Sequence, residues 1–478
     1  MCYNKLEKGE HYMEIKIVSD VRNTECDVIV AGLYEGEQTA HEIANTYAIE
    51  KDGFKGKFGQ TYLLQTYGAI PAAKILVIGL GKRDEFNENK MREISAKAVK
   101  KCQQIKAKTL AYDFETSFDY GWSATIGAMI GNYAFDKYKS EKADRVDKII
   151  MSNVSEDSIK SGKAFGDAMT FARDLANEPA EFATPEKLAE YAKSFDGIET
   201  EVSDYEKIKN MGMGAFLAVA QGSPKPPKFI HMKHYCENPK KKIAIIGKGI
   251  CFDSGGLDIK PPSSMLTMKD DMSGAACVLA VMRALKEFNP QVEVHGIIAA
   301  CENMPSGTSY KPGDILTAKN GKTIEVDNTD AEGRLTLADA LCFASELGVD
   351  EVIDIATLTG ACMVALGTVA AGIMGNDDDM IARLIETGDK NGETMWKLPM
   401  FPEYKDSLKS DIADMKNTGS RNGGASIAGV FLKEFVKDVK WAHIDIAGVA
   451  YLDKPQKELI KGATGAGVRT LLNYILQA

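Results

Sequence analysis

Short β-like runs and longer helix-like runs of hydrophobic residues follow one another along most of this chain. After about a dozen polar residues, four runs rich in Val, Ile and Leu predict strands: MEIKIVS, CDVIVAGLY, KILVIGLG and TLAYDF. Helical periodicity predicts helices near Arg92–Gln104 and Thr125–Tyr138. This alternation is typical of an α/β domain, which we expect to end near residue 150.

A helical segment, SGKAFGDAMTFARDLANEP, leads into a second alternation. Its expected strands are apolar on both faces, as parallel strands covered by helices are: KKIAIIG, VEVHGIIAA, DEVIDIATL, TVAAGIMG and KWAHIDIAG. Between them, SGAACVLAVMRALKEF and RLTLADALCFASEL predict helices. We therefore expect a smaller N-terminal α/β domain over residues 1–150 and a linking helix over 151–175. A larger α/β domain with a mostly parallel central sheet would cover 176–478.

Composition narrows the class of protein. The chain has 478 residues, of which 44% are hydrophobic, and a formal net charge of −10, so no general basic footprint for nucleic acid is present. No apolar run reaches the length of a membrane span, and the start lacks the apolar core of a signal peptide. We expect a cytoplasmic protein without a membrane or nucleic-acid partner. The nine cysteines form no CxxC pair, and we expect free thiols.

Three segments of the second domain place charged residues near the ends of predicted elements. GKGICFDSGGLDIK holds Lys248 and Asp253, MKDDMSGAA holds Asp271, and NTDAEGRL holds Asp330 and Glu332. Ligands of open α/β sheets bind beyond the carboxyl ends of the strands. Carboxylates are ligands for Mg²⁺, Mn²⁺ and Zn²⁺, and a pair of such ions removes the repulsion between crowded acids. The pattern favours a metal site.

Each segment also has a simpler structural explanation. Asp271 is placed to cap a helix, and Asp253–Gly256 has the composition of a tight turn. Asp330 and Glu332 could form a solvated, acidic helix cap. Acids two residues apart point the same way only in extended backbone, so a shared target requires an extended loop before a helix that starts near Arg334.

Other catalytic patterns fail. Phe252 occupies the first glycine position of a GxSxG motif around Ser254, and the six histidines include no HExxH. His295 and His443 lie in apolar strands, where we expect buried, hydrogen-bonded side chains. GLGKRD lacks the third glycine of a dinucleotide fingerprint and predicts a tight turn.

GKGICFDSGG, KDDMSGAA, NTDAEGRL and ATLTGA closely resemble the leucyl (cytosol) aminopeptidases, a family of two-metal peptidases. ARDLANEPA, SDIADMKN, WAHIDIAG and GATGAGVRTL extend the resemblance over roughly residues 165–475. The N-terminal domain agrees in size and alternation, and a macro-like domain is expected there. The resemblance implies removal of N-terminal amino acids, leucine and other apolar ones preferred, from peptides by a metal-bridging hydroxide. It also implies a homohexamer.

The resemblance assigns roles to individual residues. Two divalent ions per subunit, Mn²⁺ or Zn²⁺, would be held by five ligands, Lys248, Asp253, Asp271, Asp330 and Glu332. Asp253 and Glu332 would touch both ions, Lys248 and Asp271 the tighter one, and Asp330 the more exchangeable one. Lys260 would stabilise the oxyanion, and Arg334 would hold a bicarbonate that acts as general base. The remaining residues implied by the resemblance contact the substrate or the anion: Met268, Asn328, Thr357 and Gly360 for the substrate pocket, and Leu358 for the anion.

Three departures from the family pattern remove no catalytic group: Cys251 for threonine, Ser273 for glycine and Glu181 for asparagine. Cys251 predicts either oxidation-sensitive activity or simply a small buried residue. Two rival functions remain. One is another two-metal hydrolase such as a phosphoesterase, and the other is a DNA-binding or regulatory role.

Overall fold

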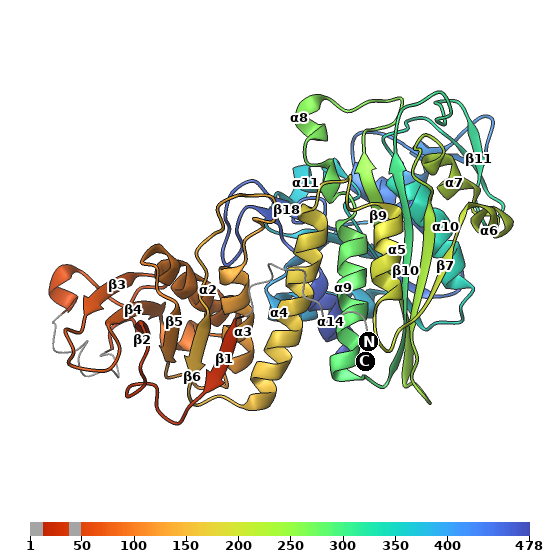
Figure 1. Ribbon diagram of the computed structural model, residues 1–478. Coiled ribbons are helices and arrows are strands. Elements are labelled where there is room, and N and C mark those ends of the chain that lie inside the picture. Colours follow the sequence, from red (N-terminus) through yellow and green to blue (C-terminus); the bar gives the residue numbers. More distant parts are fainter. Residues whose placement is uncertain (1–12, 38–48) are drawn as a thin grey trace. The chain divides into compact units, whose positions relative to one another are not determined.

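Residues 13–37 and 49–478 are described by the computed structural model, and their contacts divide the chain into two units (Figure 1). The first unit combines Met1–Thr170 with Pro455–Ile460, and the second combines Phe171–Lys454 with Lys461–Ala478. The change from one unit to the other falls within a single helix, α4 (Glu156–Asn177). None of the helices in the described ranges is long and apolar enough to cross a membrane.

The first unit contains a six-stranded sheet in the order β1-β6-β5-β2-β4-β3, in which only β3 runs antiparallel to its neighbour. Its elements are β1 (Glu14–Ile17), β2 (Val28–Tyr34), β3 (Thr61–Gln65), β4 (Lys74–Gly81), α2 (Glu88–Gln104), β5 (Thr109–Asp113), α3 (Gly121–Asn132) and β6 (Lys148–Met151). The four predicted strands are confirmed, and β3 and β6 are additional.

Helix α3 begins and ends earlier than the predicted Thr125–Tyr138. The amide of Asn132 donates to the backbone oxygen of Val146 at 2.8 Å and accepts from its nitrogen at 2.8 Å, so the chain leaves the helix there. The GLGKRD segment forms the expected tight turn, with Gly81 at φ 76° followed by a single 3₁₀ turn.

Both faces of the first unit's sheet are buried, as its parallel strands require. Along β2, Val28 and Val30 belong to one hydrophobic cluster with residues of α2 and α3, whereas Ala31 and Leu33 belong to a cluster on the opposite face. The alternation follows the two-residue period of a strand.

The second unit is built on an eight-stranded sheet in the order β15-β14-β17-β13-β9-β10-β8-β7. The four central strands, β17, β13, β9 and β10, are parallel to one another, which confirms the expected class of sheet. Strand β8 and the edge strand β7 were not predicted; β8 runs antiparallel to both β10 and β7, and β14 runs antiparallel to β17. The strands are β7 (Glu199–Ser203), β8 (Lys228–His234), β9 (Lys241–Asp253), β10 (Val292–Asn303), β13 (Glu351–Ala356), β14 (Ala371–Gly375), β15 (Met395–Lys397) and β17 (Lys440–Asp445).

Strand β9 is longer than the predicted KKIAIIG and continues to Asp253. Gly247, the last residue of the predicted strand, and Gly249 both lie inside β9. A Cβ atom on Gly247 would come within 2.4 Å of the Gly274 carbonyl oxygen, and one on Gly249 within 2.7 Å of Ile298. These glycines therefore permit close packing rather than a turn.

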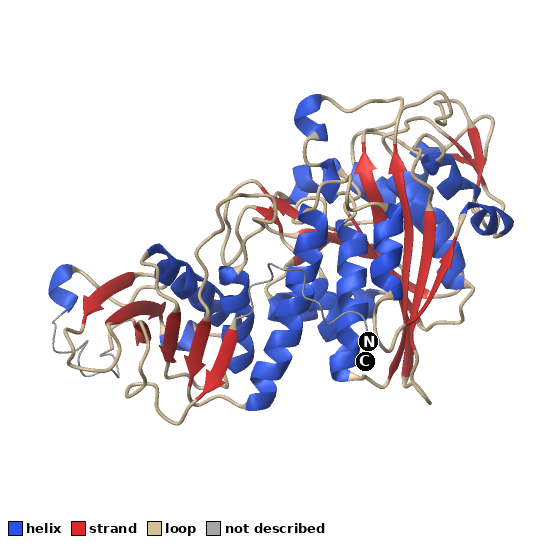
Figure 2. Ribbon diagram, in the orientation of Figure 1, coloured by secondary structure: helices blue, strands red, loops and turns tan. Residues whose placement is uncertain are grey.

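Helices cover both faces of this sheet (Figure 2). The helices of this unit that follow α4 are α5 (Pro185–Lys193), α6 (Tyr205–Asn210), α7 (Gly214–Ala220), α8 (Pro262–Met265), α9 (Ser273–Phe288), α10 (Gly333–Ser345), α11 (Gly360–Leu366), α12 (Asp378–Asn391), α13 (Gly424–Lys433) and α14 (Val468–Leu476). Short pairings complete the unit: β11 (Ile315–Thr317), β12 (Thr323–Glu325) and β16 (Met415–Lys416) in one small sheet, and β18 (Tyr451–Leu452) with β19 (Gly462–Ala463).

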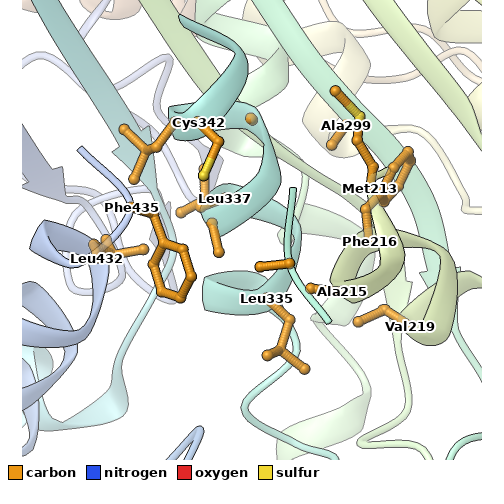
Figure 3. Close-up of a cluster of buried hydrophobic side chains, with 14 of the residues drawn as sticks. Met213, Ala215, Phe216, Val219, Ala299, Leu335, Leu337, Cys342, Leu432 and Phe435 are labelled. Carbon is orange, nitrogen blue, oxygen red and sulfur yellow. The ribbon is translucent and has the colours of Figure 1, made fainter. Parts of the chain in front are cut away.

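Helix α10 is anchored in a hydrophobic core of the second unit (Figure 3). Its Leu335 and Leu337 are buried in one cluster with Phe216 of α7 and Leu432 of α13. The helix start is thereby fixed, and the acidic loop that precedes it is held at the carboxyl end of the sheet.

Candidate metal centre

Three segments bring four acids together at the carboxyl end of the central strands. Asp253 ends β9, Asp271 directly follows a 3₁₀ turn before α9, and Asp330 and Glu332 precede α10. One carboxylate oxygen from each of Asp253, Asp330 and Glu332 lies within 4.8 Å of the others. Asp253, Asp271 and Glu332 are at least nine-tenths buried, and Asp330 is half-buried.

Two lysines lie between these acids. The Nζ of Lys248 is 2.8 Å from Asp271 Oδ1 and 2.9 Å from Glu332 Oε1, and it donates to the carbonyl oxygen of Thr357 at 2.8 Å. The Nζ of Lys260 is 2.9 Å from Asp253 Oδ2 and 2.5 Å from Asp330 Oδ1. The structure therefore joins the five expected ligands and Lys260 at this place.

The structure rejects helix capping for these acids. The N-cap residue of α9 is Met272 and that of α10 is Glu332, and neither side chain accepts a capping hydrogen bond. Asp271 instead accepts a hydrogen bond at 2.7 Å from the hydroxyl of Thr357. The acids are held by other side chains rather than by helix ends.

The expectation of an extended loop before α10 is wrong. The backbone nitrogen of Ala331 donates to the oxygen of Asn328, which closes a turn, and Glu332 has helical angles of φ −79° and ψ −36°. Asp330 and Glu332 nevertheless face one target because the turn, rather than strand alternation, brings their side chains together.

Asp253 lies in a tight turn, as its sequence indicated, and also faces the acids. Its Oδ1 accepts hydrogen bonds from the nitrogen of Gly255 at 2.9 Å and from Nδ2 of the fully buried Asn303 at 2.8 Å. Gly255 and Gly256 adopt φ angles of 87° and 68°. The turn leaves Oδ2 of Asp253 directed at Lys260.

Burial and mutual repulsion govern protonation at the centre. Burial raises the pKa of Asp271 and of Glu332, and neighbouring carboxylates raise both further. Burial alone would lower the pKa of Lys248, but attraction to Asp271 and Glu332 outweighs it and the net shift is upward. The pKa of Lys260 is likewise lowered by burial but raised overall by Asp253. Without an added cation, the lysines stay charged.

The residues present fit divalent cations. Four acids face two lysines, and among the described residues the Oδ2 atom of buried Asp271 accepts no hydrogen bond. A buried carboxylate oxygen without a hydrogen bond destabilises the fold, and a bound cation would offset that destabilisation. Oxygen-rich donor sets of this kind take Mg²⁺, Mn²⁺ or Zn²⁺.

Gly333 lets α10 pass directly over Lys248. A Cβ atom at this glycine would lie 2.6 Å from Cε and 2.7 Å from Nζ of Lys248. Its backbone is not in the left-handed region, so the glycine is required by space rather than by backbone angles.

Arg334 supplies a positive charge in the first turn of α10. It is 8% exposed, and its Nη1 donates to the backbone oxygen of Asn417 at 2.9 Å. Among the described residues, its Nε has no hydrogen-bond partner. Burial lowers the pKa of the guanidinium to about 10. A buried arginine with an unused donor suits a small anion.

Within the described part of the chain, two of the four residues expected to line the substrate pocket contact the acids and lysines of the centre and two do not. Thr357 and Asn328 contact the centre, because Thr357 binds Lys248 and Asp271, and Asn328 Oδ1 accepts from the nitrogen of Asp330 at 2.7 Å. Met268 lies half-buried in a 3₁₀ turn, and Gly360 is exposed at the start of α11. The hydrogen bonds and ion pairs of the described residues do not connect these two to the acids.

The backbone of Leu358 is hydrogen-bonded within the protein. Its backbone nitrogen, the group suited to an anion, donates to Oδ1 of Asp445 at 3.2 Å. Asp445 ends β17 and also accepts from the hydroxyl of Thr359 at 2.7 Å. The loop after β13 is thus held on one side by Asp445 and on the other, through Thr357, by Lys248.

Sequence reasoning did not single out Asn303, Asn417 or Asp445. Each is fully buried and hydrogen-bonded to the loops that carry the acids or the substrate residues. The segments SDIADMKN and WAHIDIAG contain two of them, but an uncharged amide or a strand-end acid has no local pattern that marks it. In the sequence, only the family resemblance of these two segments pointed to this region, and it assigned no role to Asn417 or Asp445.

The remaining expectations concern single side chains. His295 and His443 are buried and hydrogen-bonded, to Glu293 and His231 and to Asp354 respectively. Cys251 is fully buried, and burial raises the pKa of its thiol, which disfavours the reactive thiolate.

The other two departures from the family pattern also have local roles. The hydroxyl of Ser273 donates to the Asp270 oxygen at 2.6 Å, and exposed Glu181 pairs with Lys225 at 3.1 Å. The eight cysteines in the described residues are free.

Comparison with known proteins gives consistent results. Residues 170–472 match the family model described as "Cytosol aminopeptidase family, catalytic domain", and residues 35–142 match its N-terminal domain. The chain is 46% identical over 441 residues to a probable cytosol aminopeptidase of Aquifex aeolicus, covering 90% of this chain and 89% of the relative. It is 40% identical over 495 residues to one from Alkaliphilus oremlandii, covering 97% and 99%.

Solved structures agree with this similarity. A mutant of tomato leucine aminopeptidase superposes with a TM-score of 0.89 at 35% identity, covering 99% of this chain and 98% of that one. The bottromycin maturation enzyme BotP in complex with Mn superposes with a TM-score of 0.86 at 31% identity, covering 95% and 99%. The chain therefore belongs to the cytosol aminopeptidase family and is a metal-dependent aminopeptidase.

Proposed function

We propose that this aminopeptidase releases leucine and other apolar N-terminal residues from peptides at the centre formed by Lys248, Asp253, Asp271, Asp330 and Glu332. The observation that carries the proposal is the convergence of Asp253, Asp330 and Glu332 within 4.8 Å, with Lys248 and Asp271 directly behind them. The Mn complex of a structural neighbour supports divalent ions at such a centre.

Two divalent ions, Mn²⁺ or Zn²⁺, would be held by these five residues. Asp253 and Glu332 would serve both ions, Lys248 and Asp271 the tighter ion, and Asp330 the more exchangeable one. When bound, ions of this kind act as Lewis acids and lower the pKa of water. Lys248 would have to release its proton to become a ligand, and only a dication at bonding distance offsets the acids that now raise its pKa.

The protein's own side chains supply the remaining chemistry. Lys260 keeps its proton because Asp253 and other acids raise its pKa, and it would stabilise the negative charge that develops on the scissile carbonyl oxygen. Arg334 would hold bicarbonate through its guanidinium, whose Nε has no hydrogen-bond partner among the described residues. A bicarbonate there would supply a base that the chain does not encode.

The substrate would be oriented by the loops around this centre. Thr357, which already contacts two proposed ligands, and Asn328 would lie beside the bound residue, with Met268 and Gly360 completing its pocket. The nitrogen of Leu358 is occupied by Asp445, so an anion at Arg334 would have to compete for it.

We also propose a cytoplasmic homohexamer with its active sites facing an interior cavity. The family resemblance supports this assembly. Peptides small enough to enter such a cavity would be its substrates.

The function is tested by removing metal with a chelator and restoring Mn²⁺, Zn²⁺, Co²⁺ or Mg²⁺ singly. Turnover of a panel of aminoacyl anilides should disappear and return, with the leucyl anilide among the best substrates. An aryl phosphate measured in parallel should stay uncleaved. Turnover of the phosphate but not the anilide would replace the proposal with a phosphoesterase. Salt-dependent binding of duplex DNA in a mobility shift would add the regulatory role.

A further inference from the structure

Asn417 directly follows β16, the strand that pairs in parallel with β12. This pairing continues one residue further, because the backbone nitrogen of Asn417 donates to the oxygen of Glu325 at 2.9 Å. The small sheet thereby places a residue from far along the chain beside the loop that carries Asp330 and Glu332. Asn417 is fully buried.

The side-chain amide of Asn417 joins both ends of that loop. Its Oδ1 accepts from the backbone nitrogens of Asp327 at 2.8 Å and Asn328 at 3.3 Å. Its Nδ2 donates to the carbonyl oxygens of Asn328 at 2.7 Å and Ala331 at 3.4 Å. Two donors face its oxygen and two acceptors face its nitrogen, so the amide has one workable orientation.

The backbone of the same residue holds Arg334, whose Nη1 donates to the Asn417 oxygen at 2.9 Å. One residue thus fixes the turn before α10 through its side chain and the guanidinium after that turn through its carbonyl. Other contacts to the loop, such as Thr329 Oγ1 to the oxygen of Gly255 at 2.6 Å, hold it from the opposite side.

We propose that Asn417 is a positioning residue of the metal centre, which sets the turn from Asp327 to Ala331 so that Asp330 and Glu332 converge on Asp253. The proposal rests on the ligand set given under the proposed function. Removing a group that orients ligands typically weakens metal affinity by about 10–100-fold. Asn417 touches none of the proposed ligands through its side chain and acts on them through the backbone between them.

The test measures Mn²⁺ affinity of the metal-free protein by titration calorimetry. Asn417→Ala removes all four side-chain contacts, and Asn417→Asp keeps the size and the acceptor but puts an oxygen against two carbonyls. Both should weaken the affinity by about 10–100-fold. Asp330→Asn, a ligand change, should also weaken it.

The matched control is Asn376→Ala. Asn376 also bridges two backbone groups, donating to the Val439 oxygen at 2.9 Å and accepting from the Trp441 nitrogen at 2.7 Å. It follows β14 beside the start of β17, whereas the centre lies at the ends of the parallel strands. Asn376 is exposed, so its change should lower the thermal midpoint less than the Asn417 changes do, and it should leave Mn²⁺ affinity within about twofold of the wild type.

The outcomes separate the inference from the function. If both Asn417 variants bind Mn²⁺ as the wild type does while Asp330→Asn does not, the positioning role is wrong and the centre stands. An equal loss in Asn376→Ala would also overturn it, as would failure of both Asn417 variants to fold by circular dichroism. If Asp330→Asn and Glu332→Ala both keep the wild-type affinity, the ligand set itself is wrong.

Discussion

In the candidate metal centre, each buried charge is stabilised by a neighbouring side chain of opposite charge. Lys248 contacts Asp271 and Glu332, and Lys260 contacts Asp253 and Asp330. Removing one partner of such a group leaves another charge buried without compensation, which typically costs more than the pair contributes. Single substitutions here therefore act on stability, on metal binding and on activity together, and experiments must separate the three.

We expect Lys260→Ala and Glu332→Ala to lose activity while remaining folded. Loss of a group that stabilises an oxyanion typically lowers kcat about 10²–10³-fold, and Glu332→Ala should also weaken metal binding. Leucyl anilide turnover, measured with circular dichroism on the same samples, checks both variants. Near-normal turnover in both would show that the site is assigned to the wrong residues.

Gly333→Ala should destabilise the protein by about 1–3 kcal/mol, the usual cost of overpacking, because its Cβ would meet Lys248 at 2.6 Å. In a Lys248→Ala background the same change should cost far less, since the obstructing side chain is gone. Urea unfolding of the four proteins measures this coupling. Gly307→Ala, where a Cβ meets nothing within 4 Å, is the control. Equal costs in both backgrounds would contradict the steric explanation.

The acids could be found from sequence because charged residues beside apolar elements are unusual, and the family-like segments then gave them roles. The groups that orient them could not. Asn417 acts through an amide and a carbonyl that any loop could contain, and Thr357 was expected only to line a pocket. Their importance arises from contacts across 80 residues or more, which no local pattern records.

At the scale of elements, apolar runs predicted the central strands of both sheets, because strands covered on both faces must be apolar. Prediction failed where tertiary packing reverses a local preference. The predicted strand KKIAIIG stops at Gly247, but β9 continues through Gly247 and Gly249, where a neighbouring carbonyl and Ile298 leave no room for side chains. Strand β8, which lies between β10 and the edge strand β7, was missed because its outward residues are polar.

The pairing of β8 with β10 should make stability depend on pH. His231 stacks on His295. The pKa of His231 is lowered from 6.5 to about 4, mainly by burial and to a lesser extent by repulsion from His295. Between those values the unfolded chain binds a proton that the folded chain does not, so stability falls as the pH falls from 6.5 towards 4. The shift corresponds to at most about 3 kcal/mol.

Urea unfolding at pH 7 and pH 4.5 checks this expectation. His231→Gln should lose less stability than the wild type between the two pH values, because its side chain does not titrate. Carboxylates elsewhere contribute equally to both proteins and cancel in the comparison. An identical loss in both would mean that His231 is not held neutral by the fold.

At the scale of the whole molecule, the division into two α/β units was visible in the sequence, but its details were not. The first unit includes Pro455–Ile460, far from the rest of its residues along the chain. This segment has no motif or apolar pattern that would assign it to the first unit. Only the folded contacts reveal its membership.

The proposed assembly is open to a direct measurement. Multi-angle light scattering of the purified protein should give six times the mass of one chain, at concentrations used for activity. Anilide turnover collected across the same elution should follow the hexamer peak. Full activity in a monomer peak would contradict the assembly and leave the metal centre unaffected.

Because the first unit is built from two segments far apart in the chain, it cannot be completed until nearly the whole chain has been synthesised. Its six strands are complete once β6 has left the ribosome, but Lys100 must wait for Glu458, whose backbone oxygen accepts its hydrogen bond at 3.3 Å. At about 5–20 residues per second, that delay is roughly 15–60 s, during which almost the whole second unit is synthesised. The first unit to begin folding is thus among the last to be finished.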